Sequence, residues 1–166
     1  MAGAIALSRF LAASEPVAAA HPGQSSPPVL GALDVDAGPF SGVRFQVPSG
    51  YVARELRGAK MRTTTGLFDE FAAAFQFPYY FGDNRDAFDE CLRDLDEFVG
   101  EAPGYVAVIR DSADLLIDQS EDLDWFAEAM TDAARYWTRR GVAFRVVLQH
   151  TPAGLSPVEL TLAGPA

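Results

Sequence analysis

Cysteine and histidine are scarce in this 166-residue chain, which contains one cysteine, Cys91, and two histidines, His21 and His150. A single cysteine cannot form an internal disulfide, and neither histidine has a cysteine or a second histidine at metal-ligand spacing. These shortages argue against a disulfide scaffold, a Cys/His zinc site and a Cys–His nucleophile pair. We therefore expect no metal site and no cofactor.

Long apolar runs and positive charge are also in short supply. No apolar run reaches the ~18 residues of a membrane-spanning helix, so we expect no membrane partner. The chain has 13 Lys+Arg against 23 Asp+Glu and a net charge of −10. An acidic surface repels nucleic-acid phosphates, so we expect a basic protein as partner and no nucleic acid. The hydrophobic content of 49% predicts a soluble, monomeric globular domain with a substantial core.

The sequence motifs of common enzymes are absent. The chain has no GxxxxGKS/T or GxGxxG string for phosphate binding and no GxSxG string for a nucleophilic serine. We predict no catalytic residue and a protein that is not an enzyme. An enzyme that uses Asp86 and Glu90, one helical turn apart, as an acid/base pair is the catalytic alternative.

Acidic residues are concentrated in the middle of the chain. Residues 83–97 contain seven acidic residues and two arginines, and residues 111–128 contain seven acidic residues and no basic residue. A run of like charge is usually a solvated face, and we interpret residues 111–128 in that way. The run at 83–97 lies within a loop and helix that we treat as a candidate binding surface.

Composition divides the chain into three parts. Residues 1–48 are rich in Ala, Gly, Pro and Ser and predict a flexible extension, residues 49–152 predict an α/β domain, and residues 153–166 predict a C-terminal tail. The first residues lack the basic start of a secretory signal, and Arg9 interrupts their apolar run. A short amphipathic helix, either docked on the domain or frayed, is an alternative for that stretch.

Apolar periodicity and turn residues predict three strands and four helices in the domain. We expect strands at 51–57, 105–109 and 142–148 and helices at about 65–75, 84–98, 112–118 and 121–140. Strands separated by helices imply parallel pairing, so we predict an α/β fold with a small three-stranded parallel sheet. One face of so small a sheet is expected to be partly uncovered, which leaves room for the N-terminal extension or a partner.

The segment 78–98 combines an aromatic loop with an amphipathic helix. Gly82 is expected to supply a positive φ in the loop, and Asp83 or Asn84 is expected to cap the helix. The helix has an apolar stripe opposite a charged face, and Cys91 lies on the stripe. We therefore expect a buried and unreactive thiol at Cys91.

The sequence FPYYFGDNRDAFDECLRDL, residues 77–95, resembles the barstar family, the intracellular protein inhibitors of barnase-like ribonucleases. The residues that follow the family's loop-and-helix pattern in order are Pro78, Tyr80, Phe81, Gly82, Asn84, Asp86, Ala87, Cys91 and Leu92. The preceding helix and the ending WTRRGVAFRVVL also fit the family, and the resemblance extends over residues 51–149.

The resemblance implies a cytoplasmic inhibitor that inserts its loop and helix into the cationic active site of a basic ribonuclease, where its acids take the place of RNA phosphate. Tyr80 would pack against the enzyme, while Gly82 and Asn84 would shape the loop. Asp86 and Glu90 would pair with lysines or arginines of the enzyme. The residues that we predict to bind the partner are Tyr80, Gly82, Asn84, Arg85, Asp86, Asp89, Glu90, Arg93 and Asp94.

The chain departs from the family's type member at several positions. Glu90 stands in place of an aspartate, and Arg85 and Asp89 stand in place of apolar contact residues. Tyr136 stands where the last helix of the type member contributes an acid. A different basic ribonuclease is therefore as compatible with the sequence as barnase, and an acidic adaptor or immunity-type module that binds another basic protein is the alternative function.

Overall fold

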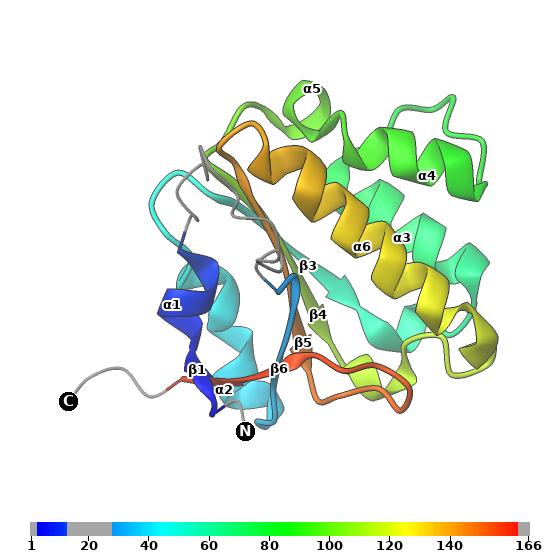
Figure 1. Ribbon diagram of the computed structural model, residues 1–166. Helices are drawn as coiled ribbons and strands as arrows, with labels where there is room; N and C mark the ends of the chain where they lie inside the picture. Colours follow the sequence, from blue (N-terminus) through cyan, green and yellow to red (C-terminus); the bar gives the residue numbers. More distant parts are fainter. Residues whose placement is uncertain (1–2, 13–27, 163–166) are drawn as a thin grey trace, which may run out of the picture.

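Three strand-forming segments of the sequence form adjacent strands at one end of a parallel sheet, and shorter segments extend the sheet on the other side (Figure 1). The computed structural model describes residues 3–12 and 28–162. The strand order is β1-β6-β2-β5-β4-β3, and each neighbouring pair is parallel. The strands are β1 (Ile5–Ala6), β2 (Leu30–Leu33), β3 (Val52–Arg57), β4 (Gly104–Arg110), β5 (Ala143–Gln149) and β6 (Val158–Thr161).

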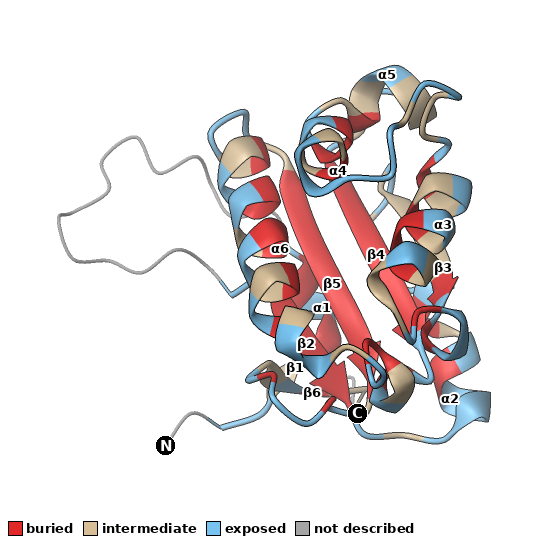
Figure 2. Ribbon diagram, turned by 90° about the vertical axis from the view of Figure 1, so that its right-hand side faces the viewer, coloured by how far each residue is buried: buried red, intermediate tan, exposed pale blue. Residues whose placement is uncertain are grey.

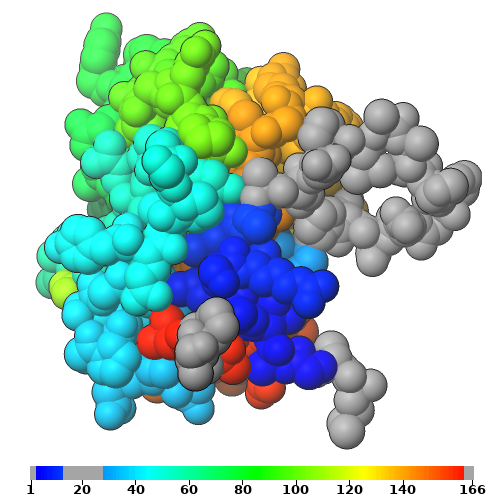
Figure 3. Space-filling model, turned by 90° about the vertical axis from the view of Figure 1, so that its left-hand side faces the viewer, coloured from blue at the N-terminus to red at the C-terminus, as the bar shows by residue number. Residues whose placement is uncertain are grey.

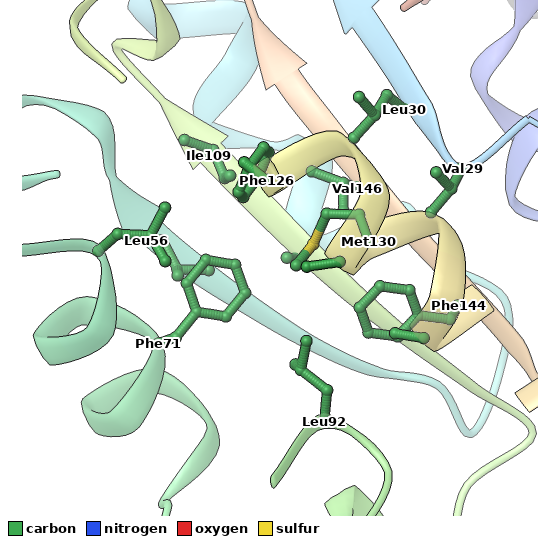
Figure 4. Packing of buried hydrophobic residues seen from close by; sticks show 14 of the residues in the cluster. Val29, Leu30, Leu56, Phe71, Leu92, Ile109, Phe126, Met130, Phe144 and Val146 are labelled. Atoms are coloured by element: carbon green, nitrogen blue, oxygen red, sulfur yellow. The ribbon is translucent and has the colours of Figure 1, made fainter. Parts of the chain in front are cut away.

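Four helices cover one face of the sheet: α3 (Thr64–Phe75), α4 (Arg85–Leu92), α5 (Leu95–Val99) and α6 (Leu123–Thr138). Figure 2 shows α3 and α6 beside the buried strands β4 and β5, with α4 and α5 near one end of them. Ile109 of β4 points to these helices and belongs to one core with Phe71 of α3 and Phe126 of α6 (Figure 4). This core supports the loop and helix between α3 and β4.

The opposite face of the sheet is covered by N-terminal segments: α1 (Leu7–Leu11), α2 (Ala37–Ser41) and the 3-10 helix η1 (Val43–Phe45) (Figure 3). Val106 and Val108 of β4 point to this side and form a second core with Phe10 and Phe40. A parallel sheet with apolar residues on both faces needs such cover. Of the two expected occupants of this face, the N-terminal extension is the one that packs there.

A buried arginine joins α1 to the sheet. Arg145 of β5 is 3% exposed, and its Nε donates a hydrogen bond of 3.0 Å to the carbonyl oxygen of Phe10. Tyr51 Oη donates to the carbonyl oxygen of Leu11 at 2.8 Å. Burial lowers the pKa of Arg145, while its neighbour Tyr51 acts in the opposite direction. These two donors satisfy carbonyl groups at the C-terminal end of α1, where a short helix has no partners of its own.

The sheet has six strands rather than the three predicted, because β1, β2 and β6 lie in the segments that composition assigns to an extension and a tail. The prediction of a flexible extension over 1–48 does not hold for residues 3–12 and 28–48, and β6 lies within the predicted tail, 153–166. Residues 1–2 and 13–27 of the predicted extension and residues 163–166 of the predicted tail lie outside the described residues. The structure contains six described α-helices instead of about four.

Gly31 of β2 explains how the added strands fit. A Cβ atom at Gly31 would lie 2.6 Å from Leu160 Cδ1 and 2.9 Å from Phe10 Cζ. Glycine therefore allows the side chains of β6 and α1 to approach the sheet closely.

Two predicted helices differ from the observed ones. The helix expected over 84–98 is divided into α4 and α5, which are separated by Arg93 and Asp94. The helix expected over 112–118 is a 3-10 turn, η3 (Ser112–Asp114). The remaining elements between β3 and β5 are confirmed to within two residues. None of the described helices combines the length and the apolar character that crossing a bilayer requires.

Candidate functional site

The loop between α3 and α4 is held by two phenylalanines that point into the core. The helix α3 ends at Gln76, whose φ of 58° is left-handed, and the Phe77 N–H then bonds to the carbonyl oxygen of Ala72 at 3.0 Å. The Phe81 ring lies 5.7 Å from the Phe68 ring and 5.2 Å from the Phe77 ring. The Phe81 N–H closes a turn onto the carbonyl oxygen of Pro78 at 2.9 Å, so the loop has a defined shape.

The same turn directs two tyrosines away from the protein. Tyr79 is 100% exposed and Tyr80 is 70% exposed, and their ring centroids lie 5.7 Å apart in an edge-to-face arrangement. Singly exposed apolar side chains are common, but two adjacent exposed aromatic rings on an ordered loop are typical of a protein-binding surface. Tyr80 is among the residues predicted to bind a partner, and the neighbouring Tyr79, which was not predicted, is exposed beside it.

Asn84 begins α4 by capping it. Its side-chain oxygen accepts a 2.8 Å hydrogen bond from the Ala87 N–H, and its Nδ2 donates to the carbonyl oxygen of Gly82 at 3.2 Å. The cap is therefore Asn84 rather than Asp83. The positive φ expected at Gly82 occurs at Asp83 instead, where φ is 49°. Aspartate tolerates this region because its short side chain interacts locally with the backbone.

The helix α4 separates apolar and charged side chains as the periodicity predicts. Phe88, Cys91 and Leu92 are buried, whereas Asp86 and Glu90 are exposed. Burial, together with the charges of Asp94 and Glu90, raises the pKa of the Cys91 thiol to about 11. The prediction of a buried Cys91 is confirmed, and a thiol with this pKa is almost entirely protonated at neutral pH.

Asp89 differs from the exposed acids Asp86 and Glu90 because its carboxylate is partly buried. Its Oδ1 atom is buried and has no hydrogen-bond partner among the described residues. Burial raises the pKa of Asp89, Arg93 opposes that shift, and the charges of Asp132 and Asp86 add to it. A carboxylate kept in such surroundings is a common property of functional sites.

The helix α6 brings a further acid to α4. Asp132 acts electrostatically on Asp89, and its own side chain is 67% exposed. Asp132 lies one helical turn before Tyr136, the position at which the resemblance leads us to expect no acid. The guanidinium carbon of Arg140 lies over the Tyr136 ring, 3.8 Å from its centroid. In the sequence, the spacing of Asp124, Glu128 and Asp132, which recur every four residues, indicates an acidic face on this helix.

Arg85 is engaged within the protein. Its Nη2 donates to Asp122 Oδ1 at 2.8 Å, and its guanidinium carbon lies 4.8 Å from the Trp125 ring centroid. Arg93 is exposed beside Asp89 and Asp94 is half-buried at the junction with α5. The Trp137 indole N–H donates to the carbonyl oxygen of Leu92 at 2.8 Å, which ties this junction to α6.

The structure brings the predicted residues together on one loop and one helix, at the end of the sheet where β4 begins (Figure 1). The described part of the chain contains no group of three or more His, Cys, Asp or Glu residues arranged to hold a metal ion. The molecule is thus a parallel α/β domain that presents an exposed aromatic loop beside an acidic helix face.

Residues 51–149 match the family described as Barstar (barnase inhibitor), and the chain belongs to this family. A comparison with curated proteins finds no match. The matched part begins just before β3 and ends with β5, so it contains the aromatic loop, α4 and the helix-covered face. The elements β1, α1, β2, α2 and β6 lie outside it.

Proposed function

We propose that the chain inhibits a basic ribonuclease by placing the loop 78–84 and the acidic face of α4 in the cationic active site of the enzyme. The observation that carries this proposal is the adjacency of exposed tyrosines and exposed acids within the family-matched part of the chain. Carboxylates at this position take the place of RNA phosphate. The protein acts as a stoichiometric monomer in the cytoplasm and performs no catalysis.

Electrostatics supports this role in two ways. The net charge of −10 attracts a basic enzyme over several ångströms, and this attraction weakens as salt is added. Contact then supplies cations to the acids of α4, among which Asp89 has a carboxylate oxygen without a hydrogen-bond partner in the described part of the free protein. Such a carboxylate costs stability in the free protein and gains a partner only in the complex.

The residues divide into three roles. Tyr80, with Tyr79 beside it, packs on the enzyme surface as an aromatic anchor. Gly82 and Asn84 fix the loop and the start of α4. The acids that pair with lysines or arginines of the enzyme are Asp86, Asp89, Glu90 and Asp94, with Arg93 facing an acid of the enzyme at the edge and Arg85 acting through Asp122 and Trp125 to position α4.

Titration of a barnase-like ribonuclease with the purified chain tests the proposal. Glu90→Gln and Asp86→Asn keep the side-chain size and remove the charge, and each is expected to weaken inhibition by about 2 kcal/mol, roughly thirtyfold. The matched control is Asp124→Asn, an exposed acid on α6, for which only a small change is expected. Inhibition that is absent at low salt, or that all three variants retain equally, contradicts the proposal.

The second candidate function is an acidic adaptor that binds a basic protein other than a nuclease. Asp89 favours it, because this partly buried acid stands in place of an apolar contact residue of the type member. Co-purification from the native cell separates the two functions. A main partner that is basic, is not a hydrolase and loses binding with Glu90→Gln would establish the adaptor.

A further inference from the structure

The outer edge of the sheet at β3 has features that the inhibitor function does not use. β3 is the last strand in the sheet order, and among the described residues no strand pairs with its outer side (Figure 2). An open strand edge presents backbone donors and acceptors to any extended chain, and most proteins block such edges. We call β3, together with Arg44 and Arg110 beside it, the β3 edge.

The backbone of the β3 edge is only partly blocked. The Arg57 N–H donates outward to Glu70 Oε2 at 3.1 Å, instead of to β4. Because successive residues of a strand direct their N–H groups to opposite sides, Ala53 and Glu55 also direct theirs outward. Glu70 therefore caps one end of the edge and leaves the stretch before it open.

The side chains of the β3 edge are basic, in contrast to the molecule as a whole. Four arginines, Arg44, Arg54, Arg57 and Arg110, stand against two acids, Glu55 and Glu70. Arg44 and Arg110 share Glu55, at 3.9 Å and 3.6 Å. Positive charge is thus in excess here, whereas the whole chain carries −10.

Two further features point to a ligand at the β3 edge. Arg54 Nε is buried and has no hydrogen-bond acceptor among the described residues. Phe45 is 74% exposed, with the Arg44 guanidinium carbon 4.6 Å from its ring centroid. A buried donor without an acceptor is costly, and the exposed phenylalanine next to Arg44 offers an apolar contact.

We infer that the β3 edge is a second interaction surface, which binds an extended acidic peptide segment of a partner protein as an added strand. The backbone of Ala53 and Glu55 supplies the strand hydrogen bonds, and the arginines select acidic side chains. A second copy of this chain fits less well, because β3 paired with β3 would place arginines of both copies along one seam. Nucleic acid fits less well because a sugar-phosphate backbone cannot complete the strand hydrogen bonds that Ala53 and Glu55 offer.

Amide NMR with a defined probe tests the inference. The probe is an octapeptide of alternating valine and glutamate, and the control probe has lysine in place of glutamate. The acidic peptide is expected to shift and protect the amides of Ala53 and Glu55. Arg54→Gln and Arg110→Gln are each expected to weaken its binding about tenfold, whereas Arg139→Gln, which replaces the exposed arginine just after α6, leaves binding unchanged.

Ala53→Pro removes one outward N–H without removing a hydrogen bond to β4, so it is expected to abolish binding while the melting temperature changes little. If this variant does not fold, a probe methylated on alternate backbone nitrogens makes the same test from the peptide side. Ribonuclease inhibition is expected to be unchanged in all these variants, which separates this surface from that of α4.

Four outcomes overturn the inference. They are the absence of amide shifts at Ala53 and Glu55 at millimolar peptide, equal binding of the lysine peptide, stronger shifts of the same amides by a uridine hexanucleotide, and self-association through these amides without peptide. The third would make the β3 edge a nucleic-acid surface, and the fourth would make it a dimer interface.

Discussion

The side chain of Arg85 is bonded to Asp122 across the gap between α4 and α6, with Nη2 and Oδ1 2.8 Å apart. The same guanidinium lies over Trp125. An arginine in the first turn of an acidic helix would otherwise offset the negative face. Its bond to Asp122 directs that charge to a neighbouring acid of the same protein, so the acids of α4 remain available to a partner.

Replacement of Arg85 tests this relationship. Arg85→Gln is expected to lower the free energy of unfolding by about 0.5–1 kcal/mol, because the pair is half-exposed and screened by solvent. Inhibition of a basic ribonuclease at low salt is expected to stay within a fewfold of the parent. Urea denaturation and inhibition titration measure the two effects. Arg139→Gln, which replaces an exposed arginine outside the loop and α4, serves as the control for charge. A large loss of inhibition confined to Arg85→Gln would contradict the small effect expected.

The Asp89 carboxylate is expected to lower the stability of the free protein and to strengthen its binding to the enzyme. Its pKa is raised by burial and by the charges of Asp132 and Asp86, against the effect of Arg93. Because the folded-state pKa lies above the unfolded-state pKa, the Asp89 carboxyl stabilises the folded protein below its unfolded-state pKa, and this stability is lost as pH rises through the folded-state pKa. Asp89→Asn should therefore raise the unfolding midpoint of the free protein at pH 7 slightly and weaken inhibition. An unchanged unfolding midpoint would contradict the first part.

The two exposed tyrosines are expected to contribute to binding and not to folding. Tyr79→Ser and Tyr80→Ser should each leave the melting temperature nearly unchanged, because both rings are largely in solvent. Each should weaken inhibition by about 1–2 kcal/mol if its ring becomes buried on the enzyme. Phe81→Ser is the contrasting variant, since that ring packs on Phe68 and its loss should destabilise the protein. Full inhibition by the Tyr79→Ser/Tyr80→Ser double variant would remove the loop from the binding surface.

Cys91 gives a prediction at high pH. Its folded-state pKa is about 11, raised from about 9, with burial as the main cause. The folded protein holds the thiol proton more tightly, so this contribution to stability is complete below pH 9 and is lost between about pH 9 and 11. Urea denaturation at pH 8.5 and 10.5 should show a larger loss of stability for the parent than for Cys91→Ala. At pH 8, iodoacetamide should modify the unfolded chain much faster than the folded one.

The second layer of the fold is expected to be required for stability. Phe10 is buried against the sheet, and Phe10→Ala should lower the free energy of unfolding by about 3 kcal/mol. Phe45→Ala, which removes a ring that is 74% exposed, should change it very little. Inhibition per folded molecule should be the same for both variants, as Phe10 lies on the face opposite α4. Equal stability of the two variants would mean that α1 contributes little to folding.

The central strands and main helices could be predicted because their signals are local. β4 and β5 are mostly apolar and are buried along their length apart from Arg110 at the end of β4, and α3 has an aromatic face and a threonine cap at Thr63. β1 has two residues, and β2 and β6 have four each. Segments so short have no measurable periodicity, and their pairing with β5 or with one another is decided by tertiary contacts. Within β2, Gly31 is the local feature that indicates the close approach of Leu160 and Phe10 to this strand.

In the candidate site, too, some features follow from neighbouring residues in the sequence, and others depend on contacts between distant parts of the chain. The cap at Asn84, the buried Cys91 and the exposed acids follow from positions along α4 itself. The break before α5 could not be predicted, because the apolar spacing continues through Leu92 and Leu95 as it would in one helix. The contacts of α4 with Asp122, Asp132 and Trp137 connect residues more than thirty positions apart, and they arise only when α6 packs beside α4.

The pairing of Ile5 with Leu160 has a consequence for biosynthesis. Among the described strands, β1 is synthesised first and its partner β6 is synthesised last. The layer that covers the valines of β4 and β5 on the face opposite α4 is therefore completed only after β6 has been made. The helices on the other face come from one continuous stretch, so the part of the nascent chain that carries α4 can fold before the sheet is closed.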